Sequence, residues 1–372
     1  MKKFNNAPKP YLPQKLPLEN LKINTDEMID LMINASSAMG VYKGFLYNTI
    51  NPMLLISPLL VQESVLSSKL EGTHATIEDF LNYEAGNNTE IEIDEMREIA
   101  NYRAALYHAL ENMGTITDDS TGKLPLSTKI LKQMHKILLN NVRGNTKNPG
   151  NFKRVQNYIG SVSEISYTPV SPQMTNEYMT NLENYIHLDE NKILIQSAII
   201  HAQFEMIHPF EDGNGRIGRL LIPLFLYYKE YLPLPTFYMS EYFEKNRTEY
   251  LQHLSNISRN NDWYGWIKYY LDGIIEQANK NTLKAQRLLM NYSEMKEKST
   301  KTLSSKYTIT ALDFIFKHPV FKANQLKEEL GAKSSTTIYK LLDDFINLKI
   351  LTKTDEKRNI TYYCPDIILS TK

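Results

Sequence analysis

The sequence has 372 residues, of which 42% are hydrophobic and 23% are charged, proportions that are typical of folded globular proteins. The length predicts two or three domains, and the composition excludes a disordered tail or a collagen-like rod. Lys plus Arg and Asp plus Glu both number 42, so the formal net charge is zero. Attraction of the whole molecule to nucleic acid or to an anionic membrane is therefore not expected.

Three features predict a soluble protein of the cytoplasm. The chain has one cysteine, Cys364, which cannot form an internal disulfide. The first residues, 1–5, contain no apolar stretch of the kind found in secretion signals. The longest apolar run, residues 220–228, is too short to span a bilayer and is interrupted by Pro223. We therefore expect no membrane partner.

The predicted elements are almost all helices. Prolines at positions 8, 10, 13 and 17 predict an extended N-terminal arm, because proline has no amide hydrogen to donate. Apolar residues then recur every three to four positions as far as residue 110, and Pro125 and Ser127 are start signals for a helix over 124–139. Residues 155–170 are predicted as a short hairpin, and helices are predicted again over 174–188 and 193–207. The expected fold class is mainly α.

A second unit is predicted at the C-terminus, after a polar stretch over residues 291–305 that we interpret as a linker. The pattern predicts helices over 309–316, 323–330 and 334–348, followed by strands over 350–354 and 359–364. This order predicts a winged helix-turn-helix domain over residues 306–372.

The charge of this unit leaves its function open. Residues 301–372 carry twelve Lys plus Arg against eight Asp plus Glu. The predicted recognition helix offers Lys333, residues 334–337, Tyr339 and Lys340 to DNA, but the nearby acidic pair at 343–344 would repel the phosphate backbone. DNA binding, protein docking and self-association all stay open.

Residues 208–219, with the sequence HPFEDGNGRIGR, have the composition of a phosphate site. Gly213 and Gly215 allow the backbone to turn sharply, so that amides at the start of a helix beginning near Asn214 can face an anion. Arg216 and Arg219 can reach different oxygens of a phosphate chain, and two arginines at this end of a helix need an anionic partner.

Two more side chains in this segment suit phosphate chemistry. Asp212 offers a hard oxygen ligand for Mg²⁺, which normally binds one or two carboxylates together with phosphate oxygens. His208 can accept a proton from an incoming hydroxyl, since the unperturbed pKa of histidine is about 6.5. For His201 we prefer a structural role in the core. A transition-metal site made by His201, His208 and Asp212 is disfavoured, because the sequence has no His-Glu-x-x-His spacing and no cysteine pair.

This segment is similar to the signature of the Fic (filamentation induced by cAMP) family, H-x-F-x-D-G-N-G-R-x-x-R, and every fixed position matches. The likeness extends to segments within residues 149–160, 242–247 and 262–263. It implies a Fic-type helical core over residues 111–290 with a small β-hairpin flap. Residues 1–110 would then form an N-terminal arm and a helical region in front of that core.

The resemblance implies a protein adenylyltransferase that moves AMP from ATP to a hydroxyl of a target protein, with Mg²⁺ bound. His208 would be the base, and Asp212 would hold the metal ion. The nucleotide would contact residues of the signature and a base pocket: Gly213, Asn214 and Gly215 at the α-phosphate, Arg216 and Arg219 at the β- and γ-phosphates, Ile217 and Gly218 in the same helix, and Tyr250 and Leu251 at the base. Phe210 would anchor the loop in the core.

The resemblance also implies how a target is held. Family members present a hairpin that aligns the target by strand addition, and five residues take that place here: Ile165, Ser166, Tyr167, Thr168 and Pro169. The partner would be a protein that offers a Ser, Thr or Tyr hydroxyl, or this chain itself. Pairing of two copies through their cores is a further expectation from the family.

An upstream segment resembles the family's inhibitory pattern, [S/T]-x-x-x-E-[G/N], through Ser67, Glu71 and Gly72. Its position implies the class that carries the inhibitory helix on the N-terminal side. A carboxylate of Glu71 paired bidentately with Arg219 would occupy the group that should bind the γ-phosphate. The pattern is short, and an ordinary surface carboxylate is the alternative for Glu71.

Two other functions are kept as alternatives. The first is a DNA-binding transcriptional regulator whose nucleotide site senses a ligand without turnover; an intact His208 argues against it, because a sensor needs no base. The second is removal of AMP from a modified protein, since in some relatives the glutamate corresponding to Glu71 orients a water molecule.

Overall fold

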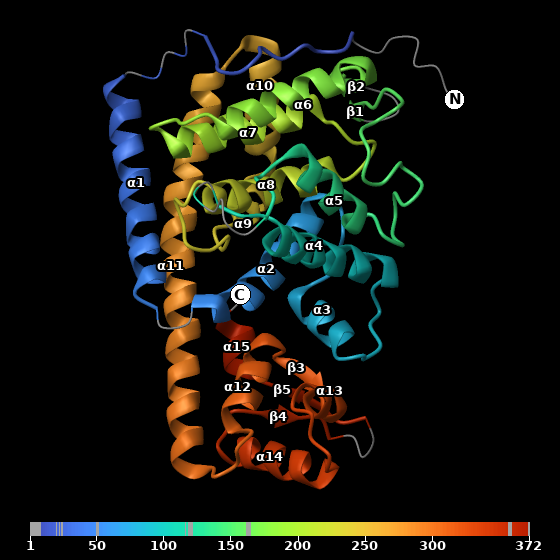
Figure 1. Ribbon diagram of the computed structural model, residues 1–372, viewed down its shortest axis with the longest axis vertical. Coiled ribbons are helices and arrows are strands. Elements are labelled where there is room, and N and C mark those ends of the chain that lie inside the picture. The colour runs from blue at the N-terminus through green and yellow to red at the C-terminus, as the bar shows by residue number, and fades with distance from the viewer. Residues whose placement is uncertain are drawn as a thin grey trace.

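The computed structural model describes residues 9–19, 21, 23, 25–49, 52–115, 117, 122–160, 165–355 and 359–370. Within these residues the fold is mainly helical, as the sequence predicts (Figure 1). The first elements are α1 (Asp26–Tyr47), the short 3-10 helix η1 (Pro52–Leu55), α2 (Ile56–Leu70), α3 (Ile77–Glu84), α4 (Ile93–Asn112) and α5 (Thr128–Leu138). The next are strands β1 (Ile159–Gly160) and β2 (Ile165–Tyr167), then helices α6 (Pro172–His187), α7 (Ile193–Ile207), α8 (Asn214–Tyr228), α9 (Ser240–Lys245), α10 (Arg247–Asn260) and α11 (Trp263–Thr302).

Helices α7 and α8 form the centre of this bundle. Nearly every residue of both helices is buried, as expected for helices that are apolar on all sides. Helices α6, α10 and α11 pack on α7, whereas α2, α4 and α5 pack on α8. The loop that joins α7 to α8, residues 208–213, is therefore held between two core elements.

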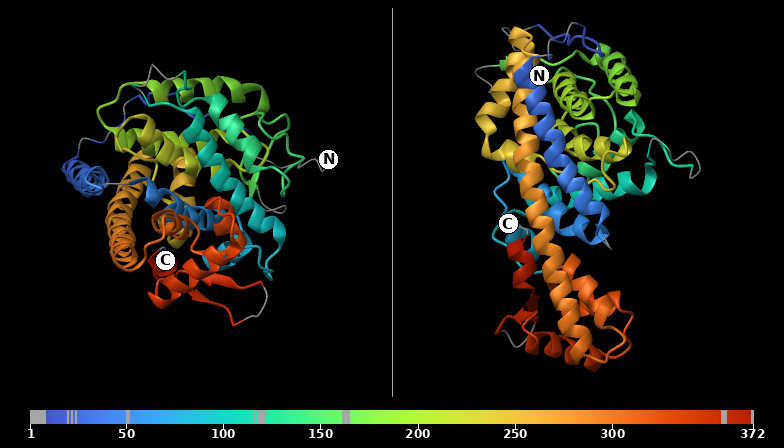
Figure 2. Two further views of the ribbon diagram at one scale, coloured as in Figure 1. Left: turned by 60° about the horizontal axis from the view of Figure 1, so that its bottom comes forward. Right: turned by 90° about the vertical axis from the view of Figure 1, so that its left-hand side faces the viewer.

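The outer helices begin at recognisable capping residues. The hydroxyl of Thr25 accepts a hydrogen bond from the amide of Met28 at the start of α1. Thr76 and Asp79 form a capping box at the start of α3. Helix α1 then lies along α11 on the outside of the bundle in both views (Figures 1 and 2).

The described part of the N-terminal arm, residues 9–19, contains no helix or strand and crosses the surface of α6 and α7. Asn181 on α6 exchanges two hydrogen bonds with the backbone of Leu16, both at 2.8 Å. Gln203 on α7 donates to the carbonyl of Gln14 at 2.9 Å. The arm is thus tied to α6 and α7 by side chains that bind its free backbone groups.

Strands β1 and β2 pair antiparallel in the segment where the sequence predicts a hairpin. Ile159 faces Tyr167, and Gly160 faces Ile165. The remaining residues of the predicted hairpin that connect the strands, 161–164, lie outside the described residues. The amide of Tyr11 in the arm donates to the carbonyl of Thr168 just after β2 at 2.9 Å, which fixes this end of the pair.

The interpretation of residues 291–305 as a linker is wrong for most of that segment. Helix α11 is 40 residues long and continues to Thr302 without a break. Met295 and Ser299 are buried on its inner face, where α12 and α15 pack against α11. The polar residues that suggested a linker are the exposed face of this helix.

The C-terminal unit contains α12 (Thr308–Lys317), β3 (Val320–Lys322), α13 (Ala323–Glu329), α14 (Ser335–Asn347), β4 (Thr352–Lys353), β5 (Thr361–Tyr363) and α15 (Pro365–Ser370). The three predicted helices and two predicted strands each correspond to one of these elements. Strand β3 and helix α15 were not predicted. The strands form one antiparallel sheet in the order β3-β5-β4. Residues 356–358, within the predicted turn between the two strands, lie outside the described residues.

This unit packs against the N-terminal helices as well as α11 (Figures 1 and 2). Val320 of β3 belongs to the same buried cluster as Val61 and Val65 of α2. The hydroxyl of Ser57, in the first turn of α2, donates to the carbonyl of Lys317 at 3.1 Å. Helix α2 is therefore shared between the helical bundle around α7 and α8 and the C-terminal unit.

One segment, Met53–Leu70, is long and apolar enough to cross a membrane by length and composition alone. Within the fold 83% of it is buried, and it includes the buried polar residues Gln62, Glu63 and Ser64. Such burial is typical of a core helix of a globular domain.

Candidate active site

The centre of the site is the loop between α7 and α8. Helix α7 ends at His208, whose backbone is left-handed with φ 49° and ψ 61°. The chain then turns through residues 209–212, and Gly213, with φ 74°, starts α8. A side chain at Gly213 would both strain this conformation and lie 3.2 Å from a methyl group of Leu138. The first backbone amides of α8 therefore end in this loop, as the sequence predicts.

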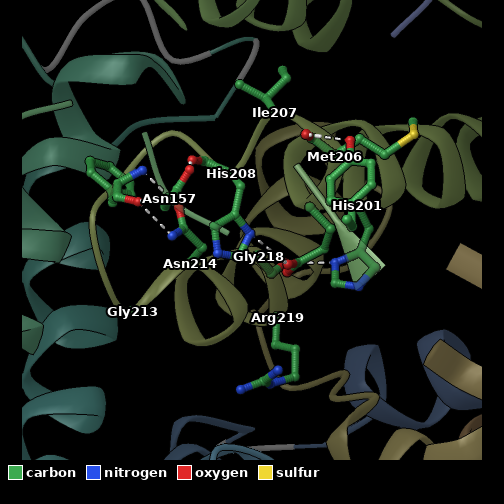
Figure 3. Close-up of polar contacts among 12 residues, drawn as sticks. Asn157, His201, Met206, Ile207, His208, Gly213, Asn214, Gly218 and Arg219 are labelled. Carbon is green, nitrogen blue, oxygen red and sulfur yellow. Dashed lines mark hydrogen bonds and ion pairs between the residues drawn. The ribbon is translucent and has the colours of Figure 1, made fainter. Parts of the chain in front are cut away.

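Side-chain amides fix the shape of the loop. Asn214 accepts a hydrogen bond from the amide of Phe210 and donates one to its carbonyl, both at 2.8 Å. Asn157 donates to the carbonyls of His208 and Phe210 at 3.2 and 2.9 Å (Figure 3). Both polar atoms of the Asn214 side chain thus hold the loop, and one of its two N–H groups remains for the α-phosphate contact, which stays a prediction.

A second layer supports the loop from α5. The amide of Gly150 donates to Nδ1 of His135, so Nε2 of the same ring carries the hydrogen that binds the carbonyl of Asp212 at 2.9 Å. The ring of His135 also stacks on Phe210 at 3.8 Å between centroids, and Phe210 is completely buried, as expected for an anchor. Burial lowers the pKa of His135 to about 4 and keeps the ring neutral.

Arg219 is buried in α8 and faces the end of α2. Its Nε donates to the hydroxyl of Ser67 at 2.7 Å, and its Nη2 donates to the carbonyl of Ser67 at 2.9 Å and to Oε1 of Glu71 at 2.8 Å. The contact with Glu71 is thus one hydrogen bond and not the two-point pairing that we expected. Burial acts to raise the pKa of Glu71, but the charge and hydrogen bond of Arg219, together with the charges of Arg216 and His208, hold that pKa below its usual value.

Gly72, the third residue of the upstream pattern, follows directly after α2. Its backbone has φ 99°, a value that glycine adopts without strain. Its amide donates to the carbonyl of Lys69 at 3.0 Å, which closes the end of the helix. Gly72 therefore sets the position of Glu71 through the backbone.

Arg216 does not face the same space as Arg219. Its side chain is 1% exposed, and its Nη1 donates to Glu98 of α4 at 2.9 Å. Arg143, in the loop after α5, contacts the other oxygen of Glu98 at 3.5 Å, and Asp212 lies 3.9 Å from Nη2 of Arg216. The guanidinium that we expected at the phosphates is therefore neutralised by a buried carboxylate.

A cavity of about 430 Å³ opens beside the loop. Its lining comes from α2, the strand pair, the end of α7, the start of α8 and one face of α10: Leu70, Glu71, Tyr158, Ile159, Ser166, Tyr167, Glu205, Met206, His208, Gly215, Arg219, Arg247, Tyr250, Leu251, Leu254, Ser255 and Ser258. The Glu71–Arg219 pair and the imidazole of His208 thus face one space.

Burial controls the electrostatics of the groups in this cavity. Burial, and after it the charge of Lys153, lowers the pKa of His208 to about 4, so the imidazole is neutral near pH 7. Burial raises the pKa of Glu205 to about 7 despite the nearby charge of Arg219. Lys153 donates to the carbonyls of Ile207 and His208 at 3.1 and 2.8 Å, and burial lowers the pKa of Lys153 to about 7.

Comparison with known families identifies this arrangement. Residues 125–226 match the Fic/DOC family, and residues 29–111 match the N-terminal region of Fic/DOC family proteins. The chain belongs to the Fic/DOC family. The two matched regions include the loop of residues 208–213, helix α2 and the hydrogen-bonded pair of Glu71 and Arg219.

Curated relatives match part of this Fic/DOC chain. It is 31% identical over 124 residues to the protein adenylyltransferase fic-1 of Caenorhabditis elegans, which covers 32% of this chain and 23% of that protein. It is 28% identical over 145 residues to the protein adenylyltransferase Fic of Culex quinquefasciatus, which covers 38% of this chain and 26% of that protein. The chain thus spans about a quarter of the length of these relatives.

Solved structures show the same fold. A Fic family protein from Desulfovibrio desulfuricans G20 aligns with a TM-score of 0.56 and 19% identity, covering 90% of this chain and 95% of that one. A Fic domain containing signaling protein from Bacteroides thetaiotaomicron VPI-5482 aligns with a TM-score of 0.54 and 21% identity, covering 68% and 97%. The helical bundle is therefore the Fic fold.

The Fic loop and its cavity bring together only some of the residues predicted for the site. Eight predicted residues line the cavity: Glu71, Ser166, Tyr167, His208, Gly215, Arg219, Tyr250 and Leu251. The others lie around it or behind it: Ser67, Gly72, Ile165, Thr168, Pro169, Asp212, Gly213, Asn214, Arg216, Ile217 and Gly218. Ile217 and Gly218 are buried in the contact between α7 and α8 and do not face the cavity.

Sequence reasoning missed two charged residues of the cavity. Glu205 lies one turn before His208 in α7, and its spacing of three residues was a signal that could have found it. Arg247 begins α10, inside a segment that already resembled the family, but nothing in its spacing separated it from an ordinary surface arginine.

The Fic loop offers the carboxylate of Asp212 to a magnesium ion. Among the described residues, no group of three or more His, Cys, Asp or Glu side chains is arranged to hold a metal ion. Asp212 offers a carboxylate, 35% exposed, next to the first amides of α8. One carboxylate is sufficient when phosphate oxygens supply further ligands, so the donor set suits an ion that arrives with a nucleotide.

Proposed function

We propose that this protein is an adenylyltransferase that moves AMP from ATP to a hydroxyl side chain of a protein. One observation carries the proposal: the imidazole of His208 opens onto the same cavity as Arg219 and the amide end of α8 at Gly215. An anion site and a neutral base that share one cavity suit transfer of a phosphoryl-type group, which needs positioning and charge stabilisation. The adenylyltransferase names of the relatives from Caenorhabditis elegans and Culex quinquefasciatus support this reaction.

In the proposed step, each group of the loop has a separate role. The target hydroxyl loses its proton to Nε2 of His208 while its oxygen attacks the α-phosphorus of ATP. The bond from that phosphorus to the oxygen that bridges it to the β-phosphate breaks, and pyrophosphate leaves with the electron pair. The amides at residues 213–215 stabilise negative charge on the α-phosphate, and Arg219 binds the terminal phosphates.

Asp212 would hold Mg²⁺ in this reaction. The ion, when bound with the nucleotide, neutralises charge on the phosphate oxygens. The hydrogen bond from His135 to the carbonyl of Asp212 keeps that residue at the edge of the amide site.

Helix α10 supplies the wall for the adenine. Tyr250 is 4% exposed, and its hydroxyl binds His201, whose other ring nitrogen binds the carbonyl of Gly218. The ring of Tyr250 stacks on Phe243 at 4.4 Å between centroids. Because Tyr250 is held on both sides, it presents a fixed edge, and the adjacent Leu251, 47% exposed, adds an apolar surface for the base.

The strand pair β1–β2 supplies the docking edge for the target. Ser166 and Tyr167 line the cavity, and Tyr167 is anchored by a hydrogen bond from its hydroxyl to the carbonyl of Met206 at 2.9 Å. An extended target segment added to β2 would bring its side chain toward His208.

The end of α2 restrains this activity in the proposed mechanism. The hydrogen bond between Arg219 and Glu71 occupies the guanidinium that should bind the γ-phosphate. Replacing Glu71 by Gly should therefore raise AMP transfer. Labelled ATP and purified chains would measure transfer to the protein itself, and a rate equal to or below that of the wild type would contradict the inhibition.

The base is tested by comparing His208→Ala with the wild type, both in the Glu71→Gly background. Incubation with labelled ATP and Mg²⁺, alone and with cell lysate, should yield protein-linked AMP only when His208 is present. Equal labelling of both chains would overturn the assignment of the base. Binding of ATP without any labelled protein would favour a nucleotide sensor.

The C-terminal unit is proposed to be a winged helix-turn-helix domain. The order α12–β3–α13–α14–β4–β5 and the sheet β3-β5-β4 support this assignment. The first residues of α14 are exposed, as are Tyr339 and Lys340, so this helix is available to a DNA groove. Gel-shift titrations over rising salt should show weaker duplex binding for Lys333→Glu and Lys340→Glu, whereas unchanged binding would exclude this helix.

A reducing compartment is proposed from the cysteine content. Cys364 is free and buried in the C-terminal unit, and burial raises the pKa of its thiol to about 12. A thiol of this kind is unreactive, which suits a protein of the cytoplasm.

A further inference from the structure

Glu205 and His208 form a close pair of buried ionisable groups at the end of α7. Oε2 of Glu205 lies 4.0 Å from Nδ1 of His208, and the two side chains are 12% and 21% exposed. Figure 3 shows the imidazole of His208 directed toward α8 beside Gly218. The spacing of three residues would place both side chains on one face of a helix, and here the left-handed backbone at His208 turns the ring onto the carboxylate.

The opposite helix provides space for this carboxylate. A methyl group at Gly218 of α8 would lie 2.1 Å from Oε1 of Glu205, a distance that no real contact allows. The absence of a side chain at Gly218 is therefore what lets a carboxylate lie between α7 and α8, next to the imidazole.

Two polar atoms of this pair lack a hydrogen bond of normal geometry. Among the described residues, Oε1 of Glu205 and Nδ1 of His208 are buried side-chain atoms without a hydrogen bond. Buried polar atoms without partners are destabilising, so they persist mainly where they have a function. A small rotation of either side chain would bring them into hydrogen-bond contact.

We propose that Glu205 is a positioning residue for His208: its carboxylate accepts a hydrogen bond from Nδ1–H, which leaves the lone pair on Nε2 free to take the proton of the target hydroxyl. When Nε2 accepts that proton, both ring nitrogens carry hydrogen and the ring becomes positive. The carboxylate then stabilises the imidazolium until the proton leaves. The inference rests on the proposed adenylyltransferase function.

Other charged groups surround Glu205 and His208 and affect the pKa values of both. Arg219 on α8 and Glu71 on α2 face Glu205 with opposite effects on its pKa, and the hydroxyl of Tyr250 on α10 also lies close. Lys153 faces His208 and lowers its pKa, and the backbone carbonyl of Glu205 also acts on the ring and raises it. The backbone carbonyl of Glu205 and its side-chain carboxylate compete for the hydrogen on Nδ1 of His208. A substitution of Glu205 that changes only the side chain shows which of the two acceptors matters.

The kinetic test uses the full chain in the Glu71→Gly background, where the Arg219 contact is released. Glu205→Gln keeps the shape of the side chain and removes its charge. It should lower kcat for AMP transfer about ten- to hundredfold with little change in KM for ATP, because the charge acts on the base and not on the nucleotide. Glu205→Asp should recover part of the loss. Glu63→Gln, at another carboxylate inside the bundle that accepts from Tyr102 and Ser240, is the matched control and should stay within about twofold.

A second readout does not depend on activity. The tautomer of neutral His208, read from the ring-nitrogen shifts by NMR above pH 8 where Glu205 is ionised, should be Nδ1–H in the wild type and should shift toward Nε2–H in Glu205→Leu, because that variant has no carboxylate to accept from Nδ1. A His208 tautomer that stays Nδ1–H in Glu205→Leu, or a kcat of Glu205→Gln within about twofold of the Glu71→Gly chain, would overturn the inference. If the Glu71→Gly chain transfers no AMP at all, the proposed function fails, and the NMR measurement still decides whether Glu205 acts on His208.

Discussion

His208 combines an unfavourable backbone conformation with a reactive side chain. Its φ of 49° costs a residue with a side chain about 1 kcal/mol or more. The neighbours compensate for this cost, since Lys153 and Asn157 both donate to its carbonyl. The ring is thus directed by the backbone, and the proposed base does not have to move when substrates bind.

Glu63, in the middle of α2, should make the stability of the protein depend on pH. It is 2% exposed, and burial raises its pKa to about 7, although Ser240 and Tyr102 donate to it. The folded chain therefore holds a proton that the unfolded chain has lost, and the free energy of unfolding should fall as pH rises from about 4.5 through 7. In Glu63→Gln this contribution is absent, so the variant should gain about 1–3 kcal/mol relative to the wild type between pH 5 and pH 8.

Urea unfolding of both chains at several pH values would measure this difference. Glu249→Gln, at an exposed position of α10, is the control and should keep a constant difference from the wild type. A difference between Glu63→Gln and the wild type that does not change with pH would show that Glu63 is ionised in the fold.

At the level of single residues, the sequence predicted the groups whose partners belong to a recognisable pattern. The hydrogen bond between Arg219 and Glu71 was expected because both residues stand in known motifs. The pairing of Arg216 with Glu98 was not, because the partner lies 118 residues away and looks like any other acidic residue of an amphipathic helix. The hydrogen bonds of Asn214 to the backbone of Phe210 were not predicted either, because they depend on how the loop folds back on the start of α8.

Helices α7 and α8 approach each other so closely at one point that two positions should be coupled. Gly218→Ala would place a methyl group against Oε1 of Glu205 and 3.1 Å from Cδ1 of Phe204, so it should destabilise the fold. In the Glu205→Ala background most of that clash is gone, and the same substitution should cost about 1 kcal/mol less.

A double-mutant cycle on the free energies of unfolding measures this coupling. Gly40→Ala in α1 is the control, since a methyl group there would meet no atom within 4 Å and should be neutral or stabilising. Additive effects of the two changes at α7 and α8 would mean that the carboxylate does not occupy the space beside Gly218.

Element boundaries were predicted best where apolar spacing was strong. Helices α7 and α14 lie within a few residues of their predicted ranges, and α8 begins at the predicted residue, Asn214. The predicted boundary of α11 was too early because the exposed face of its last turns is polar. Met295 and Ser299 are the buried residues of these turns, and two positions are too few to show a helical pattern. Strand β3 and helix α15 were missed because each has six residues or fewer, too few for a periodic pattern to appear.

On the scale of the whole molecule, α2 connects two regions that are far apart in the chain. Its first turns contact the C-terminal unit through Ser57, Val61 and Val65, and its last turn presents Ser67 to Arg219. A further hydrogen bond joins the C-terminal unit to the N-terminal helices. The side chain of Gln325, in α13 just after β3, donates at 2.8 Å to the carbonyl of Glu84 at the end of α3. A helix is stiff over this length, so a displacement at one end reaches the other.

This arrangement predicts that a change at β3 alters the restraint on the active site. Val320, 4% exposed, packs in the cluster that holds Val61 and Val65, and Val320→Asp would place an unpaired charge there at a cost of about 3–5 kcal/mol. The loosened α2 should release Glu71 from Arg219 and raise self-modification by about fivefold or more. Leu369→Asp adds the same charge to the C-terminal unit at a position that is 65% exposed, and it should change neither the melting temperature nor the transfer rate. If Val320→Asp lowers the melting temperature but leaves transfer at the wild-type rate, α2 is held by the catalytic bundle alone, and the C-terminal unit has no influence on the active site.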